Sequence, residues 1–136
     1  MTHRILVVED NPANRELLCD WLEMEDYEVQ SAEDLTGAFT LFNGGKFDAV
    51  LLDVQLGRED GLAFPVQVRQ QAGTRQVPII AVTAHAMITD HERVLQAGCN
   101  ACISKPIDFK LLRQQLQQWL ALTNTSRQHA ASVEQK

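Results

Sequence analysis

Acidic, hydroxyl and amine side chains follow the short apolar runs of this 136-residue chain. Glu9 and Asp10 come after the first run, and Asp53, Thr83 and Lys105 each come after a different run. Carboxylates held close together raise one another's pKa unless a cation lies between them, and a set of oxygen ligands suits Mg²⁺. A carboxylate nucleophile beside a metal ion, an ammonium group and a hydroxyl group can accept a phosphoryl group. The residue types therefore predict magnesium-dependent phosphoryl transfer, provided that the fold brings them together.

The elements that must position these residues alternate along the chain. The apolar runs are continuous rather than alternating, which is typical of strands in a parallel sheet covered on both faces. The expected strands are Ile5–Val8, a weaker one at Tyr27–Gln30, Ala49–Leu52, Ile79–Val82 and Ala101–Ile103. Amphipathic stretches separate them, so the pattern predicts an α/β fold, a doubly wound five-stranded parallel sheet with five helices. The carboxyl ends of such strands meet at one edge, where ligands bind.

Several local signals predict where the helices lie. A stripe of apolar residues predicts that the first helix buries Leu17 together with its neighbours Leu18, Trp21 and Leu22. Thr89 and Glu92 have the spacing of a capping box, which predicts a helix that begins at Thr89 and ends at Gly98. Pro65 is expected in the first turn of the third helix, and Asp108 as the N-cap of the last. Residues 1–122 are expected to form one domain, and residues 123–136 a flexible tail.

Composition excludes several classes of function. The net charge of −6 argues against binding to nucleic acid, because phosphate backbones require a basic surface. No apolar run is long enough to span a membrane and no leader is evident, so a cytoplasmic protein without a membrane partner is expected. Cys99 and Cys102 form a Cys-x-x-Cys motif, which suggests a zinc or redox site. We disfavour such a site, because Cys102 falls inside a predicted strand and the sequence has no second Cys-x-x-Cys motif.

The ordered motifs resemble the receiver domains of two-component response regulators, of the single-domain, chemotaxis-response-regulator-like type. The resemblance is carried by Asp10-Asn11, Leu51-Leu52-Asp53, Thr83-Ala84 and Ser104-Lys105-Pro106, and it runs from Ile5 to Leu122. It implies a flavodoxin-like sheet with strand order 2-1-3-4-5.

The resemblance also implies roles for the acidic residues. Asp53 would accept a phosphoryl group from a histidine kinase or a histidine phosphotransfer protein. Mg²⁺ would be held by the carboxylates of Asp10 and Asp53 and by the backbone carbonyl of Gln55, and Glu9 would act on it directly or through a bound water. Gln55 and His85 occupy the two variable positions that flank the phosphoryl group, so they are expected to tune its lifetime.

The resemblance implies further roles for residues that follow the fourth and fifth strands. Thr83 and Lys105 would contact the phosphoryl oxygens, and the small Ala84 would leave access for the donor. The peptide bond between Lys105 and Pro106 is expected to be cis, a conformation largely confined to bonds that precede proline.

Two positions depart from the family pattern. Cys102 stands where the family carries a switch aromatic, and Gly57 stands where it usually carries proline. We therefore expect output to depend on the loop after Thr83 and on the helix from Thr89 to Ala97. The face built from the fourth helix, fifth strand and fifth helix would contact a downstream protein, without an output domain of its own.

Two other functions were weighed. A phosphohydrolase with an aspartyl-phosphate intermediate would need a second acid two residues after its nucleophile, where this chain has Gln55. The chain is therefore expected to be a phosphoacceptor switch that catalyses only its own phosphotransfer and slow autodephosphorylation. A flavin-binding module would carry a first loop rich in Ser, Thr and Gly, whereas Glu9-Asp10-Asn11-Pro12 repels phosphate without a metal.

Overall fold

A five-stranded parallel sheet forms the centre of the computed structural model, which describes residues 2–71, 76–84 and 88–121. Its strands are β1 (Arg4–Val8), β2 (Glu28–Ala32), β3 (Ala49–Asp53), β6 (Ile79–Thr83) and β7 (Ala101–Ser104). They lie in the order β2-β1-β3-β6-β7, and every neighbouring pair is parallel. Counted along this sheet alone, the order is 2-1-3-4-5, so the predicted fold is confirmed. A separate antiparallel hairpin consists of β4 (Gln55–Leu56) and β5 (Glu59–Asp60).

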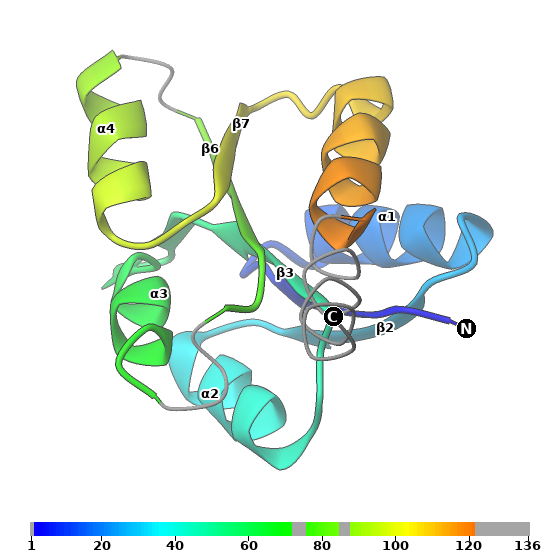
Figure 1. Ribbon diagram of the computed structural model, residues 1–136, viewed down its shortest axis with the longest axis horizontal. Coiled ribbons are helices and arrows are strands. Elements are labelled where there is room, and N and C mark those ends of the chain that lie inside the picture. The colour runs from blue at the N-terminus through cyan, green and yellow to red at the C-terminus, as the bar shows by residue number, and fades with distance from the viewer. Residues whose placement is uncertain (1, 72–75, 85–87, 122–136) are drawn as a thin grey trace, which may run out of the picture.

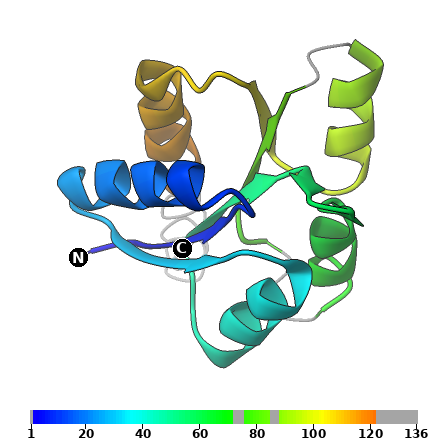
Figure 2. The same ribbon diagram turned by 180° about the vertical axis from the view of Figure 1, so that it is seen from behind.

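Helices cover both faces of the sheet (Figures 1 and 2). They are α1 (Pro12–Met24), α2 (Leu35–Gly44), α3 (Ala63–Val68), α4 (Ile88–Gln96) and a last helix over residues 109–121. In Figure 1 the last helix is orange and lies beside α1, whereas α2 and α3 lie on the other side of the sheet. The helices therefore form the two outer layers that a doubly wound sheet requires.

Alternate residues of each strand enter different cores. On β1, Ile5 and Val7 pack with α1 and the last helix, while Leu6 and Val8 pack with α2, α3 and α4. All four side chains are almost completely buried. Burial of one such side chain contributes about 2 kcal/mol, so the continuous apolar runs of the sequence stabilise both layers at once.

The helix ends agree with most of the local signals. The Asp108 carboxylate accepts the Lys110 amide at 3.0 Å, as predicted for an N-cap, and α4 is followed by Gly98 with φ +113°. Pro65 lies in the first turn of α3. The capping box at Thr89 was wrong, because α4 already begins at Ile88 and a cap residue lies outside the helix.

One expected core residue is not in the core. Leu17 is 56% exposed on α1, whereas Leu18 and Leu22 of the same stripe are buried. A helix that packs on one side of a sheet buries only part of its circumference, and the apolar stripe of the sequence is wider than that part.

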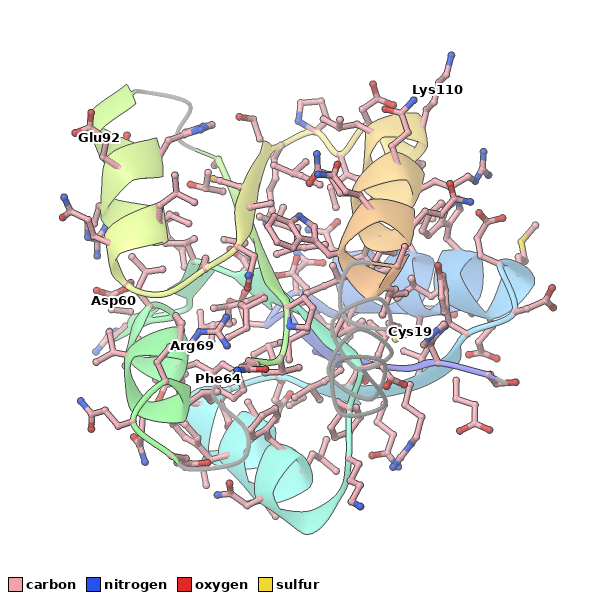
Figure 3. The ribbon with its side chains drawn as sticks, viewed as in Figure 1. Cys19, Asp60, Phe64, Arg69, Glu92 and Lys110 are labelled. Atoms are coloured by element: carbon pink, nitrogen blue, oxygen red, sulfur yellow. The ribbon has the colours of Figure 1, made fainter. Side chains whose placement is uncertain are left out.

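A polar cluster joins the amino ends of β6 and β7 to the end of α3. The Arg69 guanidinium donates to the carbonyls of Gly98 at 2.8 Å and Val77 at 2.7 Å, and to Asn100 Oδ1 at 2.7 Å. The same Asn100 oxygen accepts the Ile79 amide at 2.8 Å. Figure 3 shows Arg69 beside α3. The sequence analysis did not predict this cluster, which we call the Arg69 cluster.

No helix in the described ranges is long and apolar enough to cross a membrane. The predicted tail at residues 123–136 and the predicted tuning residue His85 lie outside the described residues.

Candidate functional site

The polar residues predicted from the sequence meet at the carboxyl ends of four neighbouring strands. Glu9 follows β1, Asp53 ends β3, Thr83 ends β6 and Lys105 follows β7. Glu9 is 2% exposed, Asp53 is 6% exposed and Thr83 is 3% exposed. Burial of three such groups is costly unless partners satisfy them, so their contacts determine what the site can do.

Lys105 lies between two of the carboxylates. Its Nζ donates to Asp53 Oδ2 at 2.8 Å and lies 3.5 Å from Glu9 Oε1. The other oxygen of Asp53, Oδ1, accepts the Gln55 amide at 2.9 Å. The Lys105 amide bonds the Thr83 carbonyl at 2.8 Å, and the bond from Lys105 to Pro106 is cis, as expected. Asp53 is thus held by a side chain and by the backbone of the loop that follows it.

The carboxylates outnumber the cations that neutralise them. Glu9, Asp10 and Asp53 each offer an oxygen within 4.8 Å of the others, and Lys105 is the ammonium group paired with two of them. Glu9 Oε2 is buried and has no hydrogen-bond partner among the described residues. A buried carboxylate oxygen without a donor is unusual, and a bound cation satisfies it. Three oxygen donors at this spacing fit Mg²⁺ better than a metal that prefers nitrogen or sulfur.

The electrostatics of the pair Glu9 and Asp53 agree with this excess of negative charge. Burial, followed by the hydrogen bond and the negative charge of Asp53, raises the pKa of Glu9 to about 7. Burial alone would lower the pKa of Lys105, but hydrogen bonds and the charges of Asp53 and Glu9 raise it. Without a further cation, the site therefore retains a proton on its carboxylates near neutral pH.

A polar cavity of about 290 Å³ opens above these groups. Its lining residues are Glu9, Asp10, Asn11, Asn14, Asp53, Gln55, Gly57, Ala84 and Lys105. The structure thus brings together most of the residues that the resemblance assigned to the pocket. Thr83 is buried nearby and is not among the residues that line this cavity.

A second, larger cavity of about 500 Å³ adjoins the first and is mostly apolar. It shares Glu9, Asn14, Asp53 and Lys105 with the polar cavity. Its apolar walls come from α1 and from the segment after β7, and they include Leu17, Pro106, Ile107 and Phe109. The apolar stripe of the sequence places Leu17 in the core, where a leucine on an amphipathic helix is usually found, so this cavity was not predicted.

The cysteines lie away from the pocket. Cys102 is half-buried in β7 and packs against the core under α2, α3 and α4. Burial raises the pKa of Cys102, and burial raises the pKa of the Cys99 thiol to about 12 despite the nearby Arg69 charge. A reactive or metal-binding thiol has a lowered pKa, so both cysteines have the character of structural residues.

Similarity to known proteins extends over nearly the whole chain. Residues 5–117 match the response regulator receiver domain family. The polar-differentiation response regulator DivK of Brucella ovis is 36% identical over 120 residues, which are 88% of this chain and 98% of DivK. The sensor histidine kinase RcsC of Salmonella typhimurium is 37% identical over 112 residues, or 82% of this chain. The matched region makes up 12% of RcsC, so the chain spans only a small part of that relative.

A solved structure shares both the fold and the nature of the site. The receiver domain of the sensor histidine kinase PA1611 from Pseudomonas aeruginosa has a TM-score of 0.81 and 36% identity. The similarity covers 89% of this chain and 99% of that domain, which was solved with magnesium coordinated in its active-site cleft. The acidic cluster of this chain is compatible with the same ion. By fold, motif order and similarity, the chain belongs to the response regulator receiver domain family.

Proposed function

We propose that this chain is a magnesium-dependent phosphoacceptor switch in which Asp53 receives a phosphoryl group. The observation that carries the proposal is the buried, unpartnered Glu9 Oε2 in a cluster of three carboxylates beside Lys105. Clusters of this kind need a cation to be fully ionised. Membership of the receiver family supports the same conclusion.

The carboxylates of Glu9, Asp10 and Asp53 would hold the magnesium ion, together with the backbone carbonyl of Gln55. Bound there, Mg²⁺ neutralises the carboxylates and the oxygens of the incoming phosphoryl group. Receiver domains bind Mg²⁺ at this acidic site as a family property, and the oxygen donors of this chain fit that role.

The chain's own residues then account for the transfer. A carboxylate oxygen of Asp53 forms a bond to phosphorus while the bond from phosphorus to the donor's histidine nitrogen breaks, and that nitrogen keeps the electron pair. Lys105, 2.8 Å from Asp53, stabilises the negative charge on the acyl phosphate. Thr83 would contact a phosphoryl oxygen, and Gln55, Ala84 and His85 would set the access of water and donor. Turnover is limited to this phosphorylation and to slow hydrolysis of the product.

The apolar cavity suggests how the donor reaches Asp53. It opens beside Asp53 and is walled by Leu17, Ile107 and Phe109, so a kinase or phosphotransfer protein with apolar side chains around its histidine would fit there. The downstream partner would use the face formed by α4, β7 and the last helix. Leu95 on α4 and Leu111 on the last helix are exposed apolar residues on those elements.

The test measures covalent phosphorylation. Incubation of the full chain with Mg²⁺ and acetyl phosphate should add one phosphoryl group, detected by intact-protein mass spectrometry. Asp53→Asn should reduce the initial rate by at least about a hundredfold, because the nucleophile is lost. Asp20→Asn, which removes an exposed carboxylate of α1, should leave the rate unchanged. Equal labelling of Asp53→Asn and wild type would refute the assignment of the phosphoacceptor.

A further inference from the structure

We propose that Asp60 and Arg93 are positioning residues that couple the phosphoryl pocket to helix α4 through the β4–β5 hairpin. The inference rests on the proposed function, because it concerns how phosphorylation of Asp53 is transmitted. Three sets of contacts carry it: those of the first strand with the pocket, those of the residue after the hairpin with the Asp53–Val54 backbone, and those of the second strand with α4.

The first strand of the hairpin forms one wall of the pocket. The Gln55 amide donates to Asp53 Oδ1 at 2.9 Å, so this strand is bonded directly to the phosphoacceptor. The turn that follows contains Gly57 with φ +60°, a conformation that L-residues other than glycine rarely adopt. A Cβ atom at Gly57 would lie 3.7 Å from Asp10 Oδ2. The hairpin is therefore bonded to Asp53 and lines the same cavity as Asp10, the two residues that would hold the metal beside the phosphoryl group.

The base of the hairpin is fixed against the backbone of the phosphoacceptor. The Gly61 amide, directly after β5, donates to the Val54 carbonyl at 2.7 Å. A Cβ atom at Gly61 would lie 2.3 Å from the Asp53 carbonyl oxygen, so the two segments are as close as backbones can be. Any displacement of the Asp53 backbone must therefore also move the end of the hairpin at Gly61.

The second strand of the hairpin, β5, is bonded to α4. Arg93 Nη2 of α4 lies 2.6 Å from Asp60 Oδ2, and the other carboxylate oxygen of Asp60 accepts the Leu62 amide at 3.0 Å. Figure 3 shows Asp60 in the region between α4 and α3. The adjacent Glu59 accepts the Leu35 amide at the start of α2 at 3.0 Å. Both Asp60 and Arg93 are 56% exposed, so they can separate and re-form without disturbing the core.

These contacts form a continuous path from Asp53 through Gln55 and its paired residue Asp60 to Arg93. Cys102 in β7 is too small to transmit a change by the movement of a large ring, and the hairpin offers a route that does not depend on this position. Coupling of this kind acts in both directions. Occupation of the pocket should change the environment of α4, and loss of the ion pair should change the affinity of the pocket.

The test uses the full ¹⁵N-labelled chain, with Mg²⁺ and beryllofluoride as the phosphoryl mimic. Amide signals of Gln55 and Ala84 report on the pocket, and those of Val94 and Gln96 report on α4. In wild type both sets should shift together as the mimic saturates. In Arg93→Ala and Asp60→Ala the pocket signals should still shift, while the α4 shifts fall to about half or less. The midpoint of the titration should rise by about two- to fivefold, the range expected for an exposed ion pair.

The double variant and a matched control determine the outcome. Asp60→Ala with Arg93→Ala should reduce the α4 shifts no further than either single change, because both single changes break the same ion pair. Arg113→Ala removes an ion pair between the last helix and Glu25, the C-cap of α1, and should behave like wild type. Wild-type α4 shifts in both single variants, additive losses in the double variant, or an equal loss in Arg113→Ala would each overturn the coupling. If the pocket signals of wild type do not move, the proposed function fails, and this inference fails with it.

Discussion

Two polar clusters, one half-buried and one buried, lie at opposite ends of the central sheet, and they differ in how completely their charges are satisfied. In the Arg69 cluster, the guanidinium meets the carbonyls of Gly98 and Val77 and the side chain of Asn100, at 2.7–2.8 Å. At the carboxyl ends of the strands, three carboxylates lie close together, the ammonium group of Lys105 pairs with two of them, and Glu9 Oε2 is left without a partner among the described residues.

The difference separates a structural cluster from a functional one. Buried polar groups that only stabilise a fold are satisfied within the chain, since an unsatisfied group costs about 1–3 kcal/mol. The acidic site remains incomplete, and burial, followed by the hydrogen bond and the negative charge of Asp53, raises the pKa of Glu9 to about 7. We therefore expect that removal of the Arg69 charge lowers the free energy of unfolding, whereas removal of the Glu9 charge raises it in the metal-free protein.

The largest effect is expected at the Arg69 cluster. Arg69→Met keeps the apolar stem but removes the donors to three acceptors, so the free energy of unfolding should fall by about 3 kcal/mol. Urea denaturation monitored by circular dichroism measures this change. As a control, Arg113→Met removes an exposed ion pair and should remain close to wild type. A loss for Arg69→Met no greater than that of the control would show that the cluster is not structural.

The fold and the acidic site could be predicted because both depend on local pattern. Continuous apolar runs such as Ala49–Leu52 identify strands buried on both faces, and parallel strands bring their carboxyl ends together. Asp53 and Lys105, although far apart in sequence, could therefore be placed in one pocket, and they lie 2.8 Å apart.

What could not be predicted depends on long-range geometry. Arg69 reads as a surface charge near the end of a short helix, and nothing local indicates its acceptors in two distant turns. The hairpin after Asp53 was not predicted, because two-residue strands such as β4 carry no periodicity. Its link to Arg93 requires the positions of two separate elements, which the sequence of either one does not contain.

Removal of charge from the acidic site should stabilise the metal-free protein. Glu9 has a folded-state pKa of about 7 and an ordinary value of 4.5. The native state therefore binds this proton more tightly than the unfolded chain, and stability falls as pH rises from about 4.5 to about 7. Glu9→Gln should remove this loss and be about 2 kcal/mol more stable than wild type at pH 8 in EDTA, with little difference at pH 5.

Glu16→Gln, an exposed change on α1, serves as the control for denaturant unfolding at both pH values. Destabilisation by Glu9→Gln at pH 8 would contradict the comparison.

Binding of Mg²⁺ should follow the same titration with a smaller effect. A cation competes with the proton on Glu9, so magnesium affinity should rise with pH and level off above about 7. One pH unit below that value, the affinity should be about tenfold weaker, which corresponds to about 1.4 kcal/mol. Isothermal titration calorimetry from pH 5.5 to 8 measures this slope. Glu9→Gln should bind Mg²⁺ more weakly at pH 8 yet show a nearly flat profile, because the competing proton has been removed. An unchanged slope in that variant would place the titrating proton elsewhere in the cluster, and the difference between the two ends of the sheet would then not rest on Glu9.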